Sequence, residues 1–559
     1  METLVQAVRR RAEADGAAAA VTHLHYPVRQ GGGRRVAATT LTYGELDERA
    51  RAVAAELQRT CAPGARAAVL CPHDPSYVVA FLACLYAGVV AVPLHGPDAL
   101  HGRSRLASVL ADCRPEAVLT SSASAAAVRR ALAAAGPAAP RTLIETDACD
   151  DAASWRPVEA GPDAPAYLQY TSGSTAAPAG VRITGRNLAA TSAQLSAHFP
   201  GAATLVSWVP FFHDMGLVFG IAHPLSAGAH AIHLSPMSFV QDPRRWLSAI
   251  GDYRADWSVT PRFGLTHCVR AVREEHRGTL DLSSLRSLNI AGEAVHADAV
   301  AAFADAFSGC GLSPSALAPS YGLAEATLAV TAPPLGEGLV AHDFDRSALA
   351  EGKVVVAGDS SAATQRLVAC GRPKAGVSVR IADPGDGAVL PPGLVGEILV
   401  SGPNVADGYW EAPERTAAAF GAGDGWLRTG DLGFFHDERL YIVGRAGEVI
   451  IIRGRNHHPS DIEETIERAH VRTTAAAFAV EADGAERLVV VVECDQARLA
   501  AGEAARLGFA REVARTVTGV HGVSVHDLVL VRQGSLPRTS SGKIQRGRCK
   551  EHYRSGAFA

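Results

Sequence analysis

Apolar residues in the first 150 positions alternate between short runs and helical repeats. The runs at 67–71, 89–92 and 117–120 predict buried strands, and a helix beginning near Pro75 is predicted between the first two. Strands that alternate with helices at this spacing imply parallel sheets covered by helices. Because ligands in such folds bind at the carboxyl ends of the strands, we expect the functional residues there.

Two helices are predicted near the N-terminus. Residues 1–16 have an amphipathic pattern and lack the continuous apolar segment of a signal peptide, which favours a helix of the mature protein. Thr42 and Glu45 have the spacing of a capping box, ahead of a helix with Leu46 and Leu57 on one side.

An uncharged segment at 77–94 meets the length criterion for a membrane span. Gly88 and Pro93 interrupt it, however, and the pattern at 89–92 is that of a short buried strand after a buried helix. We therefore expect no integral membrane contact.

The pattern changes after Gly444. A strand at 487–494, a helix around 504–517 and a strand at 527–531 predict a small α+β unit of about a hundred residues, which is within the usual size of a domain. The Gly-rich joint 444–447 is the predicted boundary. We therefore expect two domains, residues 1–444 and residues 445–559.

A loop of small polar residues stands between two predicted strands, 166–170 and 181–184. Backbone N–H groups of small residues can converge on an anion, and Ser and Thr hydroxyls add donors, so this loop favours polyphosphate binding. It lacks the Gly-Lys-Ser/Thr run of the P-loop, and an ordinary polar hairpin is the alternative. The loop residues are Thr171, Ser172, Gly173, Ser174 and Thr175.

Composition narrows the class of protein. The chain is 48% hydrophobic and 20% charged, with a net charge of -4 and no basic stretch dense enough to neutralise a row of phosphates, which argues against nucleic acid as a partner. The ten cysteines are scattered, without a C-x-x-C pair or a His grouping at metal-ligand spacing. This usage fits reduced thiols, a cytoplasmic location and no structural zinc.

Six motifs together resemble the adenylate-forming enzyme superfamily, in its order and spacing. They are TSGSTAAPAG at 171–180, SWVPFFHDMGL at 207–217, PSYGLAEATL at 319–328, GWLRTGDLGF at 425–434, VGRAGEVIIIRGRNHHPSDIE at 443–463 and PRTSSGKIQR at 537–546. The resemblance is greatest to fatty acyl-AMP ligases, which use magnesium and ATP to activate a fatty acid. These enzymes then deliver the acyl group to the phosphopantetheine arm of an acyl carrier protein.

The resemblance implies an α/β fold with a large N-terminal domain and a small mobile α+β domain. The large domain would combine parallel-rich sheets with a distorted barrel. The small domain would carry the catalytic Lys543 into the site for adenylation and withdraw it for acyl transfer. A fatty acyl-CoA ligase would share the adenylation residues, and a nucleotide-binding relative without catalysis is a further alternative.

Roles for individual residues follow from the resemblance. Lys543 would bridge the attacking carboxylate and the phosphate, since an ammonium on a flexible stem suits a group that moves in and out. Glu325 would bind magnesium, because a hard cation prefers carboxylate oxygen. Asp431 would accept hydrogen bonds from the ribose hydroxyls, Arg445 would support ribose or phosphate, and His213 would gate the carboxylate site.

The remaining implied residues form two sets. Tyr321 would lie against the adenine, although it could equally be a core aromatic residue. The rest of the nucleotide set is Ala291, Gly292, Glu293, Ser320 and Gly322. The candidates for the acyl site, which could also be ordinary core, are Trp208, Phe212, Met215, Leu217, Phe239 and Arg262.

Four positions depart from the superfamily pattern. Ala179 replaces the usual loop Lys, so contacts to phosphate are either weaker or supplied by Arg182 or Arg186. Ala324 replaces a phosphate-contacting Thr, and Gly447 makes the joint more permissive. Arg262 replaces the more usual Asn. If the Arg262 side chain points into the acid pocket, it would indicate a polar or acidic substrate. If it points out of the pocket, it would carry no information about the substrate.

The resemblance implies that the stretch 330–368 is the counterpart of the inserted segment that restrains domain motion in the ligase family and disfavours coenzyme A. It is long enough for an extra hairpin or loop.

Overall fold

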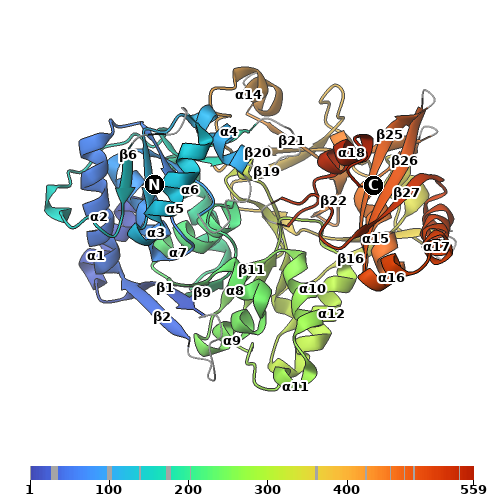
Figure 1. Cartoon of the computed structure of the whole chain (residues 1–559), viewed down its shortest axis with the longest axis horizontal. Helices are drawn as coiled ribbons and strands as arrows, with labels where there is room; N and C mark the ends of the chain where they lie inside the picture. The colour runs from blue at the N-terminus through green and yellow to red at the C-terminus, as the bar shows by residue number, and fades with distance from the viewer. Residues whose placement is uncertain are drawn as a thin grey trace.

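The large N-terminal part, coloured blue through green to yellow, and the smaller C-terminal part, coloured orange to red, lie side by side in the computed structural model (Figure 1). The predicted loop 171–175 lies outside the described residues. The structure describes residues 2–26, 36–96, 103–136, 140, 142–170, 178–201, 203–358, 363–421, 425–452, 455–470, 472–482, 485–539 and 542–558.

The first sheet has six strands, all parallel except for the antiparallel β7–β8 pair. In spatial order they are β6 (Thr142–Glu145), β5 (Ala117–Thr120), β3 (Arg66–Val69), β4 (Val90–Pro93), β7 (Pro165–Tyr170) and β8 (Gly180–Thr184). The helices of this region are α1 (Leu4–Asp15), α2 (Tyr43–Thr60), α3 (Pro75–Ala87), α4 (Arg103–Cys113), α5 (Ser122–Ala135) and α6 (Gly185–His198). The strands predicted from the apolar runs are thereby confirmed, with bounds shifted by one or two residues.

The second sheet has seven strands and is parallel except at the β1–β2 pair. Its order is β13 (Leu317–Pro319), β12 (Ser287–Ile290), β11 (Trp257–Thr260), β9 (Thr204–Ser207), β10 (His230–Leu234), β1 (Ala19–His25) and β2 (Ala37–Thr42). The helices of this region are α7 (His223–Ala227), α8 (Pro236–Gln241), α9 (Arg244–Asp252), α10 (Arg262–Ala271), α11 (Glu274–Arg277) and α12 (Ala297–Phe307). A π-helix, Met215–Ala222, follows β9.

Short antiparallel sheets complete the N-terminal part. They are β14 (Tyr321–Gly322) with β15 (Ala329–Ala332) and β18 (Arg372–Pro373), the pair β16 (Ala341–Asp345) and β17 (Thr364–Val368), and the run β19 (Ser378–Ala382), β20 (Gly396–Ser401), β21 (Leu427–His436) and β22 (Arg439–Arg445). Helices α13 (Arg346–Ala350) and α14 (Pro413–Phe420) connect strands here. The stretch 330–368, expected to hold an extra hairpin or loop, contains the antiparallel pair β16–β17, with helix α13 between the two strands.

The C-terminal part has its own sheets and core. Its strands are β23 (Ile450–Ile452), β24 (Arg455–His457), β25 (Thr474–Ala482), β26 (Ala485–Cys494) and β27 (Val525–Arg532). Its helices are α15 (Pro459–Ala469), α16 (Gln496–Ala500), α17 (Glu503–His521) and α18 (Arg546–Arg554). Ile462, Val490 and Val513 are fully buried together in this core. The domain boundary after residue 444 stays a prediction, and β22 crosses it.

Local sequence signals explain where the N-terminal helices begin and end. The capping box is confirmed, because the Glu45 amide donates to Thr42 Oγ1 at 3.2 Å and the Thr42 amide donates to Glu45 Oε2 at 2.9 Å. Helix α3 begins after the cap Asp74 and ends at Gly88, whose φ of 66° suits glycine. Among the described residues, no helix is long and apolar enough to cross a membrane.

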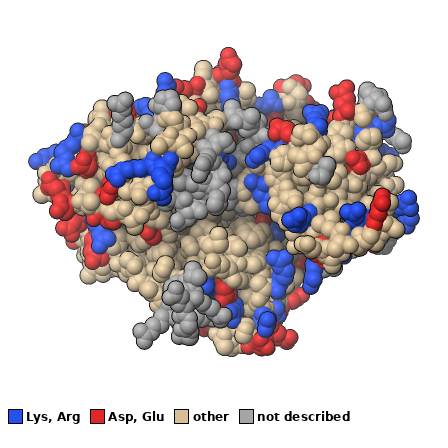
Figure 2. Space-filling view, in the orientation of Figure 1, with Lys and Arg blue, Asp and Glu red and all other residues tan. Residues whose placement is uncertain are grey.

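Charges of both signs are interspersed on the face shown in Figure 2, in keeping with the small net charge. All ten cysteine side chains are free thiols, and nine of them are buried. Burial raises the pKa of the Cys370 thiol to about 12, so that side chain is an inert core group.

Candidate active site

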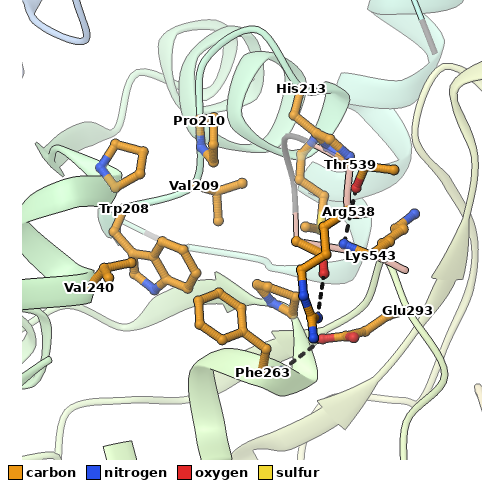
Figure 3. A pocket seen from close by; sticks show the side chains of 15 residues that line it. Trp208, Val209, Pro210, His213, Val240, Phe263, Glu293, Arg538, Thr539 and Lys543 are labelled. Atoms are coloured by element: carbon orange, nitrogen blue, oxygen red, sulfur yellow. Dashed lines mark hydrogen bonds between the residues drawn. The ribbon is translucent and has the colours of Figure 1, made fainter. Parts of the chain in front are cut away.

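A cavity of about 250 Å³ lies where the C-terminal part meets the second sheet of the N-terminal part (Figure 3). Strands β9 and β11 lead into it at their carboxyl ends, as expected for a parallel sheet. The residues that line it are Trp208, Val209, Pro210, His213, Met215, Pro236, Val240, Pro261, Phe263, Gly292, Glu293, Arg538, Thr539, Gly542 and Lys543.

The two ends of this cavity differ in character. Trp208, Val240 and Phe263 form an apolar end, whereas His213 and Lys543 lie at the other end (Figure 3). An elongated molecule with a hydrocarbon chain and a charged head matches this division, since an apolar wall stabilises the chain and a cation stabilises an anionic head.

Lys543 is positioned by a turn that closes on itself. The Thr539 amide donates to the Lys543 carbonyl at 2.7 Å, and the Lys543 amide donates to Thr539 Oγ1 at 3.0 Å. Arg538 donates to the Gly542 carbonyl at 3.1 Å and to Glu493 Oε2 at 3.0 Å, which ties the turn to β26. Gly542 has a φ of 89°, a conformation that glycine adopts without strain. The turn therefore presents Lys543 to residues more than 300 positions earlier in the chain.

His213 and Asp214 stand opposite Lys543 as a pair. His213 Nδ1 lies 2.5 Å from Asp214 Oδ1, and the Met215 amide donates to the same oxygen at 2.7 Å. Burial acts to raise the pKa of Asp214, but His213 and the charge of Lys543 outweigh it and hold that pKa below its usual value. Asp214 is therefore an anion that orients the His213 ring.

Asp431, Tyr321 and Arg445 form the second polar group of the site. Tyr321 donates its hydroxyl to Asp431 Oδ2 at 2.7 Å, and Arg445 Nε donates to Oδ1 at 2.7 Å. Asp431 and Arg445 are direct partners on β21 and β22, so the sheet fixes their separation. Burial, followed by the charge of Asp431, raises the pKa of Tyr321 well above its usual range. The sequence predicted these three residues for one ligand, and the structure brings them together.

Close backbone contacts shape the segment that follows β13. A Cβ on Gly322 would lie 1.7 Å from the Leu328 carbonyl oxygen, so only glycine fits. Thr327 has a φ of 62°, and its hydroxyl donates to the Asn404 carbonyl at 2.6 Å. Such a backbone conformation costs about 1–3 kcal/mol and persists only when the surroundings impose it.

Glu325 lies in this constrained turn and is half-buried. Its Oε1 accepts a hydrogen bond from the Tyr409 hydroxyl at 2.8 Å, and its second carboxylate oxygen has no hydrogen-bond partner among the described residues. Tyr409 in turn pairs with Val181 of β8, the strand that follows the loop 171–175. Tyr409 was not among the predicted site residues, although the G-Y-W run at 408–410 could have indicated it.

The other nucleotide candidates lie at the carboxyl ends of β12 and β13. The Ser320 amide donates to the Ile290 carbonyl at 2.9 Å, and the Ser320 hydroxyl donates to Asn289 Oδ1 at 3.0 Å. Gly292 has a φ of 88°, and a Cβ there would lie 3.2 Å from the methyl group of Met215. Ala291 is the residue between β12 and this glycine, so the parallel pairing of the two strands brings 291–293 and 320–322 to one edge.

Arg262 and Glu293 face the contact between the two parts of the molecule. Arg262 Nη1 donates to His296 Nδ1 at 2.8 Å and lies 3.7 Å from Glu467 Oε2 of α15. Glu293 Oε1 accepts from the Phe263 amide at 2.7 Å, which fixes the start of α10. Glu293 lines the cavity and Arg262 does not, so the arginine gives no indication of an acidic substrate.

The predicted acyl-site residues divide into wall and core. Trp208 and Met215 line the cavity, and Phe239 stacks behind Trp208 with ring centroids 3.8 Å apart. Phe212 packs against the ring of His95, at 3.6 Å between centroids, and Leu217 is fully buried in the core. Phe239 therefore supports the apolar end from behind, and Phe212 and Leu217 lie outside the lining.

Neither arginine offered as a substitute for the missing loop lysine carries a free charge. Arg182 pairs with Asp407, and Arg186 pairs with Asp163 at 2.6 Å. Ala179 itself is buried. The weaker electrostatic contact expected for this loop, which lies outside the described residues, stays a prediction.

Gly444 and Gly447, in the joint between the N-terminal and C-terminal parts, differ in the space around them. A Cβ on Gly444 would lie 2.8 Å from Nδ1 of the buried His458, whereas a Cβ on Gly447 would meet nothing within 4 Å. The segment between β16 and β17 also contacts the C-terminal part, because Arg346 of α13 pairs with Asp461 of α15.

Family models cover nearly the whole chain. The model described as AMP-binding enzyme matches residues 9–410, and the model described as Disco-interacting protein 2-like, AMP domain, matches residues 447–559.

Named relatives match over most of their length. The long-chain-fatty-acid–AMP ligase FadD26 of Mycobacterium tuberculosis is 38% identical, over 99% of this chain and 97% of the relative. The medium-chain-fatty-acid–[acyl-carrier-protein] ligase JamA of Moorena producens is 39% identical over 95% and 93%. FadD21 of M. tuberculosis, whose name is that of a fatty-acid–CoA ligase, is 39% identical over 93% of both chains.

A solved structure shares the fold over the full chain. The fatty acyl-adenylate ligase of Legionella pneumophila, in complex with acyl adenylate and pyrophosphate, has a TM-score of 0.76 and 33% identity. The alignment covers 99% of this chain and 96% of that chain.

Proposed function

Because the chain belongs to the AMP-binding enzymes, and within them to the fatty acyl-AMP ligases, we propose that it activates a fatty acid with ATP and passes the acyl group to a carrier-protein thiol. The observation that carries this proposal is the cavity with Trp208 and Phe263 at one end and Lys543 and His213 at the other. It would hold a hydrocarbon chain and place its carboxylate beside the lysine.

Residues of this chain fit ATP as the first substrate. Asp431 is a two-oxygen acceptor held by Tyr321 and Arg445, and ribose hydroxyls are the donors that such a carboxylate recognises. Ser320 and Gly322 lie at the carboxyl ends of parallel strands, where nucleotides bind in α/β folds. Tyr321 supplies an aromatic face for the base.

In the first half-reaction a carboxylate oxygen of the acid forms a bond to the α-phosphorus of ATP, and the bond from that phosphorus to pyrophosphate breaks. Negative charge develops on the phosphoryl oxygens, and the ammonium of Lys543 stabilises it. The Arg538–Glu493 pair and the Thr539 hydrogen bonds hold the lysine backbone, so little reorganisation is needed.

Magnesium is the metal that we propose for this step. Glu325 would hold it, because its carboxylate is half-buried, has one oxygen free of described partners and adjoins the strand that follows the loop 171–175. The ion would neutralise phosphate charge.

In the second half-reaction the phosphopantetheine sulfur of a carrier protein attacks the acyl carbonyl carbon, and AMP leaves. Lys543 must move away to admit the thiol, and a rotation of residues 445–559 at Gly444–Gly447 would withdraw it. The similarity to JamA supports an acyl carrier protein as the acceptor.

Coenzyme A is the second candidate for the acceptor. The similarity to FadD21 favours coenzyme A. The Arg346–Asp461 contact between α13 and α15 instead favours a restricted rotation of the C-terminal part. A restricted rotation favours a carrier protein, which delivers its phosphopantetheine arm to a site that opens only partly.

The acceptor can be tested directly. The purified protein is incubated with magnesium ATP, a fatty acid and equal concentrations of coenzyme A and a phosphopantetheinylated carrier protein, and the products are resolved by mass spectrometry. Acyl-carrier protein in large excess over acyl-CoA is the expected result. Acyl-CoA as the main product would show that coenzyme A, and not a carrier protein, is the acceptor.

A further inference from the structure

A group of metal-ligand side chains lies where strand β16 meets the turn between β21 and β22. His342 is on β16, His436 ends β21, and Asp437 begins the turn into β22. Each offers one ligand atom, and the three atoms lie within 4.8 Å of one another. From this arrangement we propose that His342, His436 and Asp437 form a binding site for a divalent transition-metal ion of the zinc type.

Two of the three ligand atoms already have a suitable separation. His436 Nε2 lies 3.6 Å from Asp437 Oδ2, too far for a hydrogen bond. Two donors bound at about 2.1 Å to one tetrahedral ion lie about 3.4 Å apart. The ligand atom of the third residue, His342, lies within 4.8 Å of both, so a movement of its side chain would complete the set.

The ring of His342 has the support that metal-bound histidines use. Its Nδ1 lies 2.7 Å from the hydroxyl of Tyr441, a side chain that is fully buried. When Nδ1 carries the proton and donates to this oxygen, the lone pair of Nε2 is available to a metal.

An aromatic core holds the ligands in place. Phe344 is fully buried and packs edge to face against Phe434, His436 and Tyr441, at centroid distances of 5.0, 5.5 and 5.3 Å. Because His342 and Phe344 belong to the same strand, this packing fixes β16 against the β21–β22 hairpin. The strands that carry the proposed metal ligands are therefore held together without a bound metal.

The surrounding charges allow a cation to bind. Arg439 donates to the Asp437 carbonyl at 3.3 Å, but its guanidinium pairs with Glu337 at 2.6 Å, which neutralises it. Both histidines are partly exposed and Asp437 is exposed, so an ion can enter from solvent.

The ligand set selects the class of ion. Two imidazoles and one carboxylate suit zinc, cobalt, nickel or copper, whereas magnesium and calcium prefer oxygen ligands alone. A bound ion would cross-link β16 to the β21–β22 hairpin, whose strands also carry Asp431 and Arg445.

The test uses the full-length protein after EDTA treatment and without nucleotide. Titration with Co²⁺, followed by visible absorption, and with Zn²⁺, followed by calorimetry, should show one site. His342→Ala and Asp437→Asn should each weaken binding more than tenfold, and Tyr441→Phe by about tenfold, the usual effect of losing a supporting hydrogen bond. Asp437→Asn leaves the aromatic core intact, so a folding defect cannot mimic its effect.

His276 provides the matched control. It lies 3.7 Å from Glu275 in the same kind of His–carboxylate pair but belongs to no three-ligand group in the part of the chain that the structure describes. His276→Ala should bind as the unaltered protein does. Absence of Co²⁺ binding, or equal binding by His342→Ala and the unaltered protein, would overturn the proposal.

Discussion

Arg262 of α10 and Glu467 of α15 form an ion pair across the contact between the N-terminal and C-terminal parts, with 3.7 Å between Nη1 and Oε2. The two side chains are only 21% and 24% exposed. His296 and Glu464 approach to 3.8 Å beside them, and Arg468 and Asp298 approach to 2.9 Å. The ion pairs of Glu467 and Arg468 on α15 therefore help to hold the C-terminal part where Lys543 reaches the cavity.

Glu467→Gln should lower the rate of adenylation about fivefold, because loss of a partly buried pair costs about 1 kcal/mol of the arrangement that presents Lys543. The rate of adenylation is measured as pyrophosphate release with saturating fatty acid and ATP. Glu512→Gln is the control, because Glu512 is exposed and its pair with His470, at 3.7 Å, lies entirely within the C-terminal part. If Arg262→Met and Glu467→Gln have fully additive effects, the two residues are not coupled.

Lys543→Ala should depress adenylation by about two to three orders of magnitude, the usual effect of removing one transition-state contact. ATP binding should persist, because Asp431, Tyr321 and Arg445 are untouched. Stopped-flow pyrophosphate release and calorimetry separate the two effects. An unchanged release rate would remove Lys543 from the chemistry.

Asp431→Ala should weaken ATP binding more than fatty acid binding, because the carboxylate is bonded to Tyr321 and Arg445 and lies outside the cavity lining. Separate dissociation constants for the two ligands provide the measurement. Asp386→Ala, in an exposed turn, is the control. Equal losses for both ligands would contradict the ribose assignment.

Lys374→Met should stabilise the protein and flatten its pH dependence. Burial lowers the pKa of Lys374 to about 7 from 10.5, and Nζ has no hydrogen-bond partner among the described residues. Between those two pH values the unfolded chain binds the extra proton, so stability rises with pH, by up to about 1.4 kcal/mol per unit.

Thermal unfolding at pH 7 and pH 9 checks this expectation. The melting temperature of the unaltered protein should rise relative to that of Lys374→Met. Lys353→Met changes an exposed lysine that pairs with Glu351 and should leave the difference between the two pH values unchanged. A Lys374→Met protein with the same pH dependence as the unaltered chain would show that Lys374 is charged when folded.

Much of the fold could be predicted because its signals are local. The capping box of Thr42 and Glu45, the breaks at Gly88 and Pro93, and the short apolar runs each act within one turn or one strand. The tertiary position of a side chain has no such local signal. Arg262 stands next to the lining residues Pro261 and Phe263, yet its guanidinium reaches α15.

The site was predictable where a short motif carries its chemistry. The resemblance of short motifs predicts Asp431, Tyr321 and Arg445 as site residues, and Tyr321 and Arg445 both donate hydrogen bonds to Asp431. Tyr409, Arg538 and Glu467 act through partners distant in sequence, and no periodicity indicates such pairs. The roles assigned to 171–175 stay predictions, because those residues lie outside the part of the chain that the structure describes.

Fatty acid activation is tested most directly by mass spectrometry of the product formed from purified protein, magnesium ATP and fatty acids of increasing length, without any thiol acceptor. We expect an acyl-adenylate that forms only with ATP and fatty acid together, with equimolar pyrophosphate, and that is lost in Lys543→Ala. No adenylate with any acid in the series would contradict it.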